Sequence, residues 1–394
     1  MNRLAFAICL VPSAALAGGF AVSEQTAVSS GTAGAGVARA DDPGAAWHDP
    51  AALADGGGWR FDLSMIFARP SIEARALDGS WSESNEAAWV TPPHLDVSFA
   101  RDRWAAGLSL GVPFGSGVTW PADWMGRHEI VSTELQVFRV APFFAYRFGK
   151  LRVAGGVHAD FGRLQIARNL DFIDTEGDVA IDMDGRGFGV DASAYYQASA
   201  ALSLGAIYRS RTSLPVDGGA NFTAPDAFSE KLADGGASSK LTLPDQLAVG
   251  GRYQLGRYAV LADVELALWS TSDRLVIDFA NEMTPDVAQA QAWSNTLSLR
   301  TGGEWTRDQL TLRHGLYFEQ SPAPTDTLAP SSPDSSRLGL SAGASWRFDR
   351  AWSVDAFFET MWLLRRDSTN MDALAASYGG HALFGGLGVR WTPN

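Results

Sequence analysis

The chain has 394 residues, 46% of them hydrophobic and 19% charged, and its formal net charge at pH 7 is −13. This acidic balance argues against nucleic-acid binding, which needs a basic footprint on the protein. No stretch approaches the roughly 20 consecutive apolar residues that a membrane-spanning helix requires. A bilayer could then be crossed only by a closed β-barrel, which pairs all of its backbone groups.

Residues 1–17 have the pattern of a secretory signal peptide. Arg3 forms a short basic region, residues 4–11 form an apolar core, and Ala15-Leu16-Ala17 supplies the small residues of a cleavage site. We therefore predict a mature protein that begins at Gly18. The only cysteine of the chain lies in this leader, which excludes disulfides and thiolate metal sites from the mature protein.

Residues 18–57 lack the alternation of a strand and consist largely of small residues. Because small residues allow a chain to pass close to the wall of a narrow lumen, we predict that this segment forms a hatch inside a barrel. A flexible tail on the periplasmic side is the alternative, since chain ends are often poorly ordered.

Residues 58–394 are expected to form the barrel, because apolar and polar residues alternate there in short runs. In the first run, Phe61 and Leu63 share one face and Asp62 and Ser64 share the other, as the two-residue period of a strand requires. The pattern predicts an all-β fold, a 14-stranded antiparallel transmembrane β-barrel. The expected strands are 59–67, 95–99, 104–112, 135–148, 151–161, 188–196, 202–208, 247–255, 258–268, 297–305, 310–318, 338–346, 352–358 and 383–391.

The connections between these strands are alternately short and long, and outer-membrane barrels keep short turns in the periplasm and long loops outside. The short connections are near Asp102, Gly149, Ala201, Gly256, Arg307 and Asp349. The long ones are about 70–93, 113–133, 163–185, 210–240, 270–296, 319–337 and 363–381. Trp and Tyr residues beside the short turns fit a membrane interface on that side. A large soluble β-sandwich or β-solenoid is the alternative, with the loop asymmetry accidental.

The sequence resembles the FadL-type outer-membrane transporters of long-chain fatty acids and other hydrophobic compounds, including the aromatic-hydrocarbon branch. Gly19-Phe20, the small-residue run 29–38, Asp41-Asp42-Pro43-Gly44 and the box Asp49-Pro50-Ala51 are similar to the hatch of that family. The usual box is Asn-Pro-Ala, and Asp keeps the turn plausible because both side chains bond their own backbone. Further blocks match in order at 121–127, 134–135, 241–245, 321–324 and 333–343.

The resemblance implies a kink in the third strand that opens the wall and releases substrate sideways into the bilayer. Pro113, Phe114 and Gly115 occupy the matching stretch and form the expected lateral gate. Proline lacks a ladder donor and glycine tolerates bulge geometry, so this stretch should not pair as a regular strand. An ordinary loop after the third strand is the alternative.

Apolar substrate-binding candidates follow the third strand and lie in the 210–240 loop: Phe114, Trp120, Trp124, Met125, Phe222 and Phe228. The alternative role for each of them is to pack loops together or to face lipid. A carboxylate substrate would need a cation near the mouth of the pocket, and the resemblance places Arg163 and Arg168 there. Their alternative role is an ion pair with a neighbouring aspartate.

Inward-facing charges should form a network in the lumen that supports the hatch. These charges are Asp96, Asp263, Glu265, Arg300, Arg313, Asp355, Glu359 and Arg390. The six histidines are scattered without metal-ligand spacing, and no catalytic group, metal or cofactor is expected.

We expect an outer-membrane protein of a Gram-negative cell that captures hydrophobic molecules at its outer loops and passes them to an internal pocket. The expected partners are a fatty acid, a detergent-like molecule or a hydrocarbon, together with membrane lipid and lipopolysaccharide, and the protein is expected to be monomeric. A diffusion porin for polar solutes and a loop-mediated adhesin or phage receptor are the alternatives.

Overall fold

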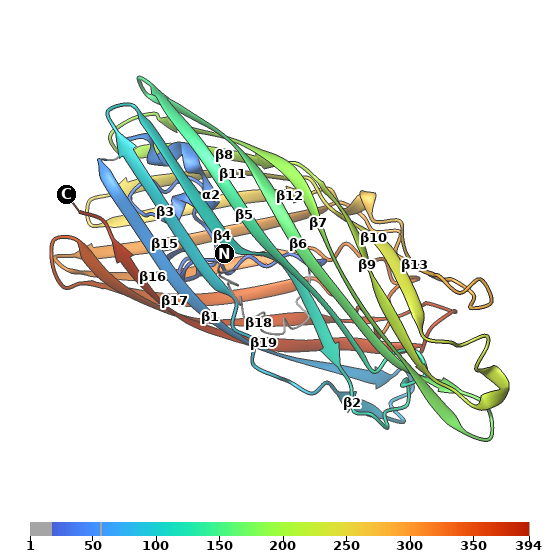
Figure 1. The fold of residues 1–394 in the computed structure, drawn as a ribbon. Helices are drawn as coiled ribbons and strands as arrows, with labels where there is room; N and C mark the ends of the chain where they lie inside the picture. Colours follow the sequence, from blue (N-terminus) through green and yellow to red (C-terminus); the bar gives the residue numbers. More distant parts are fainter. Residues whose placement is uncertain (1–17, 56, 394) are drawn as a thin grey trace.

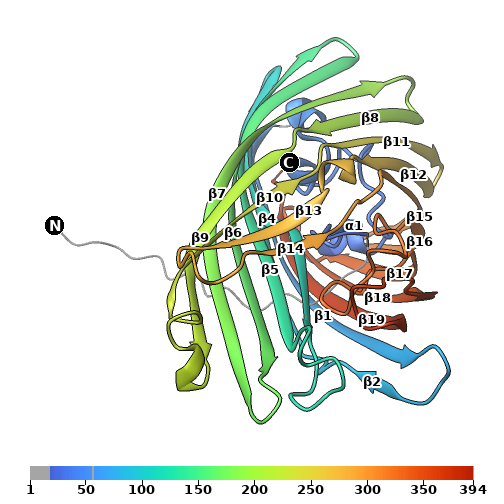
Figure 2. The same cartoon turned by 90° about the vertical axis from the view of Figure 1, so that its right-hand side faces the viewer.

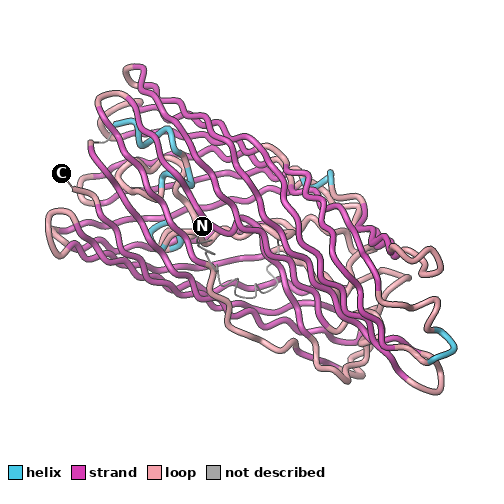
Figure 3. The backbone as a smooth tube through the Cα atoms, viewed as in Figure 1, coloured by secondary structure: helices cyan, strands magenta, loops and turns pink. Residues whose placement is uncertain are grey.

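The computed structural model describes residues 18–55 and 57–393, and the predicted signal peptide lies outside these residues. The described chain forms one closed antiparallel β-barrel of 14 strands, as the sequence predicts (Figure 1). Very little of it is helical (Figure 3). Among the described residues, no helix is long and apolar enough to cross a membrane.

The strands are longer on one side of the barrel than the sequence predicts, and several are interrupted. They are β1 (Gly58–Ala76), β2 (Ser82–Ser84), β3 (Pro93–Arg101), β4 (Trp104–Thr119), β5 (Ser132–Phe148), β6 (Leu151–Asp171), β7 (Glu176–Gln197), β8 (Leu202–Arg209), β9 (Thr212–Thr223), β10 (Gly235–Leu243), β11 (Gln246–Leu255), β12 (Tyr258–Ala267), β13 (Arg274–Phe279), β14 (Val287–Ala290), β15 (Thr296–Arg307), β16 (Leu310–Glu319), β17 (Arg337–Arg347), β18 (Trp352–Asp367) and β19 (Ala376–Trp391). The pairs β8/β9, β10/β11, β12/β13 and β14/β15 each continue one barrel strand, and β2 lies in the first outer connection.

The barrel closes between its first and last strands. β1 pairs with β19 in one unbroken antiparallel register, from Phe61 opposite Trp391 to Ala76 opposite Ala376. The short connections that the sequence predicts are confirmed, and Asp102 and Gly149 turn with φ of +57° and +65°. Both ends of the barrel sequence therefore lie on the side of the short turns (Figure 1).

The two faces of the wall exchange polarity along its height. We call the part of the wall nearer the short turns the lower part and the part on the long-loop side the upper part. In the lower part of β6, Val157 and Phe161 are exposed on the outer face, whereas His158 and Asp160 are buried inside. Beyond Gly162 the polarity of the two faces reverses. The apolar Leu164 is buried inside, and the charged Arg163 is paired with an aspartate on the outer face. This pattern fits a lipid-facing zone below and a water-facing extension above.

The exchange of polarity explains why the predicted long loops are wrong in extent. β1 continues to Ala76, although a loop was expected from residue 70, and the expected loop 163–185 is a hairpin formed by β6 and β7. A strand with charged outward residues loses the apolar-out pattern of a membrane strand, so its end is not visible in that pattern.

The N-terminal segment, residues 18–55, lies inside the barrel (Figure 2). It contains the short helices α1 (Ala27–Ser30), α2 (Ala45–His48) and η1 (Pro50–Asp55); two further single turns are η2 (Asp226–Phe228) and η3 (Trp269–Thr271). We call residues 18–55 the lumenal segment. The Asp49 Oδ1 atom accepts a hydrogen bond from the Ala51 backbone at 3.1 Å, which is the local turn expected of an Asx residue.

Candidate functional site

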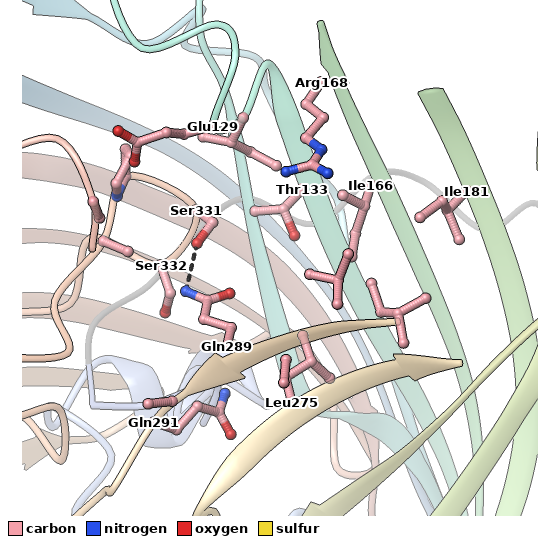
Figure 4. A pocket seen from close by; sticks show the side chains of 18 of the residues that line it. Glu129, Thr133, Ile166, Arg168, Ile181, Leu275, Gln289, Gln291, Ser331 and Ser332 are labelled. Atoms are coloured by element: carbon pink, nitrogen blue, oxygen red, sulfur yellow. Dashed lines mark hydrogen bonds between the residues drawn. The ribbon is translucent and has the colours of Figure 1, made fainter. Parts of the chain in front are cut away.

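A cavity of about 530 Å³ lies in the outer half of the barrel. Its wall comes from β4, β5, β6, β7, β9, β10, β13 and β14, and loops on the long-loop side complete it. The apolar lining consists mainly of inward aliphatic residues of the upper wall: Leu135, Leu164, Ile166, Leu170, Val179, Ile181, Leu241, Leu275 and Ile277. Figure 4 shows Ile166, Ile181 and Leu275 around this space. The inverted alternation of the upper strands therefore creates an oily interior above the polar lumen.

Four aromatic rings pack together at one end of this apolar cluster. The Phe20 ring of the lumenal segment lies 4.9 Å from the Trp293 ring and 5.9 Å from the Trp269 ring, measured between centroids. Phe114 of β4 meets the same Trp269 ring edge-on at 5.9 Å. Phe20 and Trp293 line the cavity, and Phe114 and Trp269 are fully buried in the same cluster. We call these four residues the aromatic floor.

The polar lining consists of hydroxyl, carboxyl and amide groups, together with two basic side chains, His128 and Arg168. Arg168 is the only Arg or Lys among the described lining residues, and its side chain extends from β6 toward Thr133 (Figure 4). Burial raises the pKa of the Glu129 carboxyl, which lies in the loop between β4 and β5. The Gln289 side chain of β14 donates to the Ser331 hydroxyl at 2.9 Å and so bonds this strand to the loop between β16 and β17. Among the described lining residues, Arg168 thus faces apolar, hydroxyl, amide and acidic side chains, with His128 as the one other basic group.

Strand β4 is irregular beside the aromatic floor. Its register with β5 shifts between Gly111 and Phe114, and its pairing with β3 ends at Leu110. The lumenal segment bonds the strand beyond that point: the Val22 N–H donates to the Pro113 carbonyl at 2.9 Å. The predicted break in normal pairing is therefore present, although β4 continues through it to Thr119 instead of ending in a loop.

Buried ion pairs hold the lumenal segment to the wall below the cavity. Glu304 of β15 accepts from Arg39 of the lumenal segment at 2.8 Å and from Arg313 of β16 at 2.8 Å. Asp263 of β12 accepts the backbone N–H groups of Gly36 and Val37 at 2.7 and 3.0 Å. Such charge-assisted bonds fix the segment in one position.

A second group of charges lies nearer the start of the segment. Glu319 of β16 pairs with Arg300 at 2.9 Å and with Arg337 at 2.7 Å. Arg337 also donates to the Ala21 carbonyl at 3.2 Å. Of the predicted inward charges, Asp263 and Arg300 bond the lumenal segment directly, and Arg313 shares Glu304 with Arg39 of the segment, so the network is confirmed for these three residues.

The predicted substrate-binding residues fall into separate places. Arg168 and Phe222 line the cavity, and Phe114 belongs to the aromatic floor. Trp120 and Trp124 stack on each other at 4.7 Å in a different buried cluster, where their ring N–H groups donate to backbone carbonyls.

The other three candidates lie apart from the cavity lining. Met125 is 57% exposed, Phe228 packs on Phe172 at 4.9 Å, and Arg163 pairs with Asp182. Sequence reasoning did not select Trp269, which directly precedes the expected loop 270–296, or Trp293, which lies within that loop. The aliphatic lining was also missed, although the alternation of residues 164–170 continues there with its faces exchanged.

No group of three or more His, Cys, Asp or Glu residues in the described part of the chain is placed to hold a metal ion.

Comparisons with known proteins agree with this architecture. A family model described as "Outer membrane protein transport protein (OMPP1/FadL/TodX)" matches residues 8–389. The chain is 24% identical to the long-chain fatty acid transport protein of Salmonella typhi over 395 residues, which cover 90% of this chain and 89% of that protein.

Two solved structures share the fold. A Pseudomonas aeruginosa FadL homologue superposes with a TM-score of 0.83 at 21% identity, covering 95% of this chain and 100% of that one. The P. putida toluene transporter TodX gives a TM-score of 0.72 at 19% identity, covering 88% of this chain and 92% of that one.

Proposed function

Because this chain belongs to the OMPP1/FadL/TodX family of outer membrane transport proteins, we propose that it takes up hydrophobic molecules through the cavity above its aromatic floor. The apolar cavity of about 530 Å³ is the observation that carries this proposal. Ligand pockets of roughly 300–1,000 Å³ with mostly apolar walls and a few polar groups are typical binding sites. Burial of each CH₂ group contributes about 0.8 kcal/mol, so an acyl chain or an aromatic ring would bind there without strong polar contacts.

The proposed route begins at the outer loops, passes through the cavity and leaves through the wall beside β4. Ser116 of β4 lines the cavity just beyond the register shift, which supports an exit at this strand. Release into the bilayer would spare an oily molecule the polar lumen below, where buried ion pairs surround the lumenal segment.

The lumenal segment is proposed to act as a hatch that separates the cavity from the periplasm, which places the hatch at residues 18–57 and the barrel at 58–394. A diffusion porin would need an open lumen, and here residues 18–55 occupy it. We also propose that the protein is a monomer without enzymatic activity and that its outer surface contacts lipopolysaccharide.

Two relatives suggest different substrates, since one is named for long-chain fatty acids and another for toluene. Arg168 would bind the carboxylate of a fatty acid. The acidic residues of the lining do not favour an anion: Glu129, Asp286, Asp326 and Asp372. We therefore propose a ligand that is mainly hydrocarbon, with any carboxylate placed at Arg168.

The test is to purify the full-length processed protein from outer membranes in mild detergent and identify co-purified molecules by mass spectrometry. Uptake of radiolabelled oleate and of radiolabelled toluene is measured in parallel in cells from which the gene is deleted and in the same cells with the gene restored. Gene-dependent uptake of either compound supports the proposal. Equal uptake with and without the gene, together with a large steady conductance in planar bilayers, would overturn it in favour of a porin.

A further inference from the structure

We propose that removal of the leader creates an α-ammonium group at Gly18 that forms a buried ion pair with Asp334, and that this pair fastens the start of the lumenal segment. The inference depends on the predicted cleavage after Ala17 and not on the identity of the transported ligand. The inference rests on a hydrogen bond between two residues that are 316 positions apart in the chain.

The backbone nitrogen of Gly18 donates to the Asp334 Oδ1 atom at 2.8 Å, and both residues are buried. Asp334 is only 5% exposed and lies in the loop between β16 and β17. Its second carboxylate oxygen accepts the hydroxyl of Ser321, which in turn accepts from Arg366 at 2.8 Å. The Oδ1 atom of Asp334 therefore faces the first residue of the predicted mature chain.

Asp334 has no cationic partner among the residues that the structure describes. The nearby carboxylate Glu319 already pairs with Arg300 and Arg337, and Arg366 reaches Asp334 only through Ser321. A buried ionised carboxylate is costly unless it is paired. Burial accordingly raises the pKa of Asp334, although the hydrogen bonds from Ser321 and Gly18 and the charges of Arg337 and Arg366 act in the opposite direction.

The surroundings of Gly18 fit a chain that begins with glycine. Its φ of +95° disfavours other residues, and a Cβ atom there would overlap the Glu319 carboxylate and the Arg337 guanidinium. Glu319, Arg337 and Asp334 are the charged groups that face the nitrogen, with Arg366 behind Ser321. The site is thus narrow, and among the described residues Asp334 forms no direct ion pair in it.

Cleavage supplies that cation. A signal peptidase uses one water molecule to break the Ala17–Gly18 amide bond: the hydroxyl adds to the Ala17 carbonyl carbon, and the protons pass to the nitrogen. The products at neutral pH are a carboxylate on Ala17 and an ammonium on Gly18, whose ordinary pKa is about 7.7–8.0. A neutral amide with one N–H thereby becomes a charged group with three donors.

The ion pair would also set the register of the segment beyond it. Phe20, two residues further on, contributes its ring to the aromatic floor and its carbonyl to the bond with Gly115 of β4. The ion pair would thereby help to hold Phe20 in the aromatic floor. An ion pair raises the α-amino pKa, so its stabilisation is complete below about pH 8 and is lost as the pH rises through the raised value.

The experiment measures acylation of the terminus in the processed protein from outer membranes. Intact mass first establishes the terminus, and an N-hydroxysuccinimide ester is then applied at several pH values, with peptide mass spectrometry locating the label. A pKa raised by about one unit leaves about tenfold less free amine at neutral pH, so labelling of wild-type Gly18 should be at least about tenfold slower than in Asp334→Asn. The control Asp174→Asn removes an exposed carboxylate from the β6–β7 hairpin and should label like wild type.

A heat-modifiable shift in gel mobility verifies that each variant is folded. If Asp334→Asn does not fold, the pH profile of the wild type decides alone: labelling that follows a pKa of about 7.7–8.0 overturns the inference. A mature terminus other than Gly18, or equal labelling rates in wild type and Asp334→Asn, also overturns it. A second variant with Ser-Ser inserted before Gly18 keeps that nitrogen an amide, and its new terminus should label at the rate of an exposed amine.

Discussion

The carbonyl oxygen of Phe20 accepts a hydrogen bond from the backbone N–H of Gly115 at 2.7 Å, so the lumenal segment is bonded directly to the irregular strand of the wall. The Phe20 ring lies on Trp293 in the aromatic floor. One residue thus contacts both the cavity and the break in the barrel. A ligand that moved the ring would also affect the backbone bond, because both belong to the same residue.

We expect the substitution Gly115→Trp to slow uptake of hydrophobic substrate severalfold while the barrel remains folded. Gly115 is buried beside the bond from Phe20, and a large side chain there would obstruct the proposed exit. The measurement is uptake of radiolabelled substrate by whole cells at matched expression.

The control for this prediction is Gly155→Trp. Gly155 lies on the exposed side of β6, where an added Cβ meets only one backbone oxygen at 4.0 Å. Wild-type uptake in a folded Gly115→Trp variant would contradict an exit at β4.

The lower barrel could be predicted from the sequence, and the cavity could not. In residues 151–161, apolar residues face lipid and polar ones face the lumen, so periodicity identifies both the strand and its faces. Above Gly162 the faces exchange polarity, and Leu164 and Ile166 become cavity lining instead of lipid contacts. A pattern that assigns apolar residues to the outer face cannot detect that exchange.

The aromatic floor could not be predicted from local sequence patterns, for a different reason. Phe20, Phe114, Trp269 and Trp293 come from four separate segments, and only the closed barrel brings them together. Selecting apolar residues that follow the third strand instead favoured Trp120, whose ring stacks on the nearby Trp124 ring. The resemblance to the FadL-type family is confirmed and gives the architecture, but the lining depends on tertiary contacts.

Arg168 should distinguish acidic from neutral ligands. We expect Arg168→Met to weaken binding of a fatty acid by about tenfold or more, because one charge-assisted bond contributes about 1.5–3 kcal/mol, and to leave binding of an aromatic hydrocarbon unchanged. Quenching of tryptophan fluorescence or isothermal titration would measure both affinities.

The matched control is Arg163→Met, since Arg163 is half exposed and paired with Asp182. An exposed pair of this kind contributes roughly 0–1 kcal/mol, so neither affinity should change. Equal loss of both ligands in Arg168→Met would show that the side chain supports the cavity wall instead of binding a carboxylate.

Glu304 should be essential for holding the lumenal segment in place. The substitution Glu304→Gln leaves Arg39 and Arg313 buried without their shared carboxylate, and breaking a buried pair costs about 3–5 kcal/mol. We expect hydrogen exchange of the lumenal segment to accelerate strongly and bilayer conductance to rise, while the outer strands remain protected.

Asp182→Asn, which removes the carboxylate of the exposed pair with Arg163, is the control for charge loss alone. It should leave both exchange and conductance as in the wild type. Unchanged exchange of residues 18–55 in Glu304→Gln would argue that other contacts hold the segment.

Asp49 should make the stability of the lumenal segment depend on pH. Burial raises the pKa of its carboxyl to about 7, and hydrogen bonds offset this only in part. The folded state then binds more protons than the unfolded state between about pH 4 and 7, so stability is complete below that range and falls as pH rises through it. Asp49→Asn removes the titration, and each pKa unit corresponds to about 1.4 kcal/mol, so the variant should be the more stable protein at pH 8 by a few kcal/mol.

Hydrogen exchange of residues 18–55 between pH 5 and 8.5, corrected for intrinsic rates, measures this difference. The wild type should open progressively more as the pH rises, and Asp49→Asn should give a shallower profile because an amide keeps the acceptor for Ala51 and carries no charge. Asp41→Asn is the control, since Asp41 is exposed and its loss should leave the wild-type slope intact. Parallel slopes in Asp49→Asn and wild type would mean that another group of the lumen carries the pH dependence.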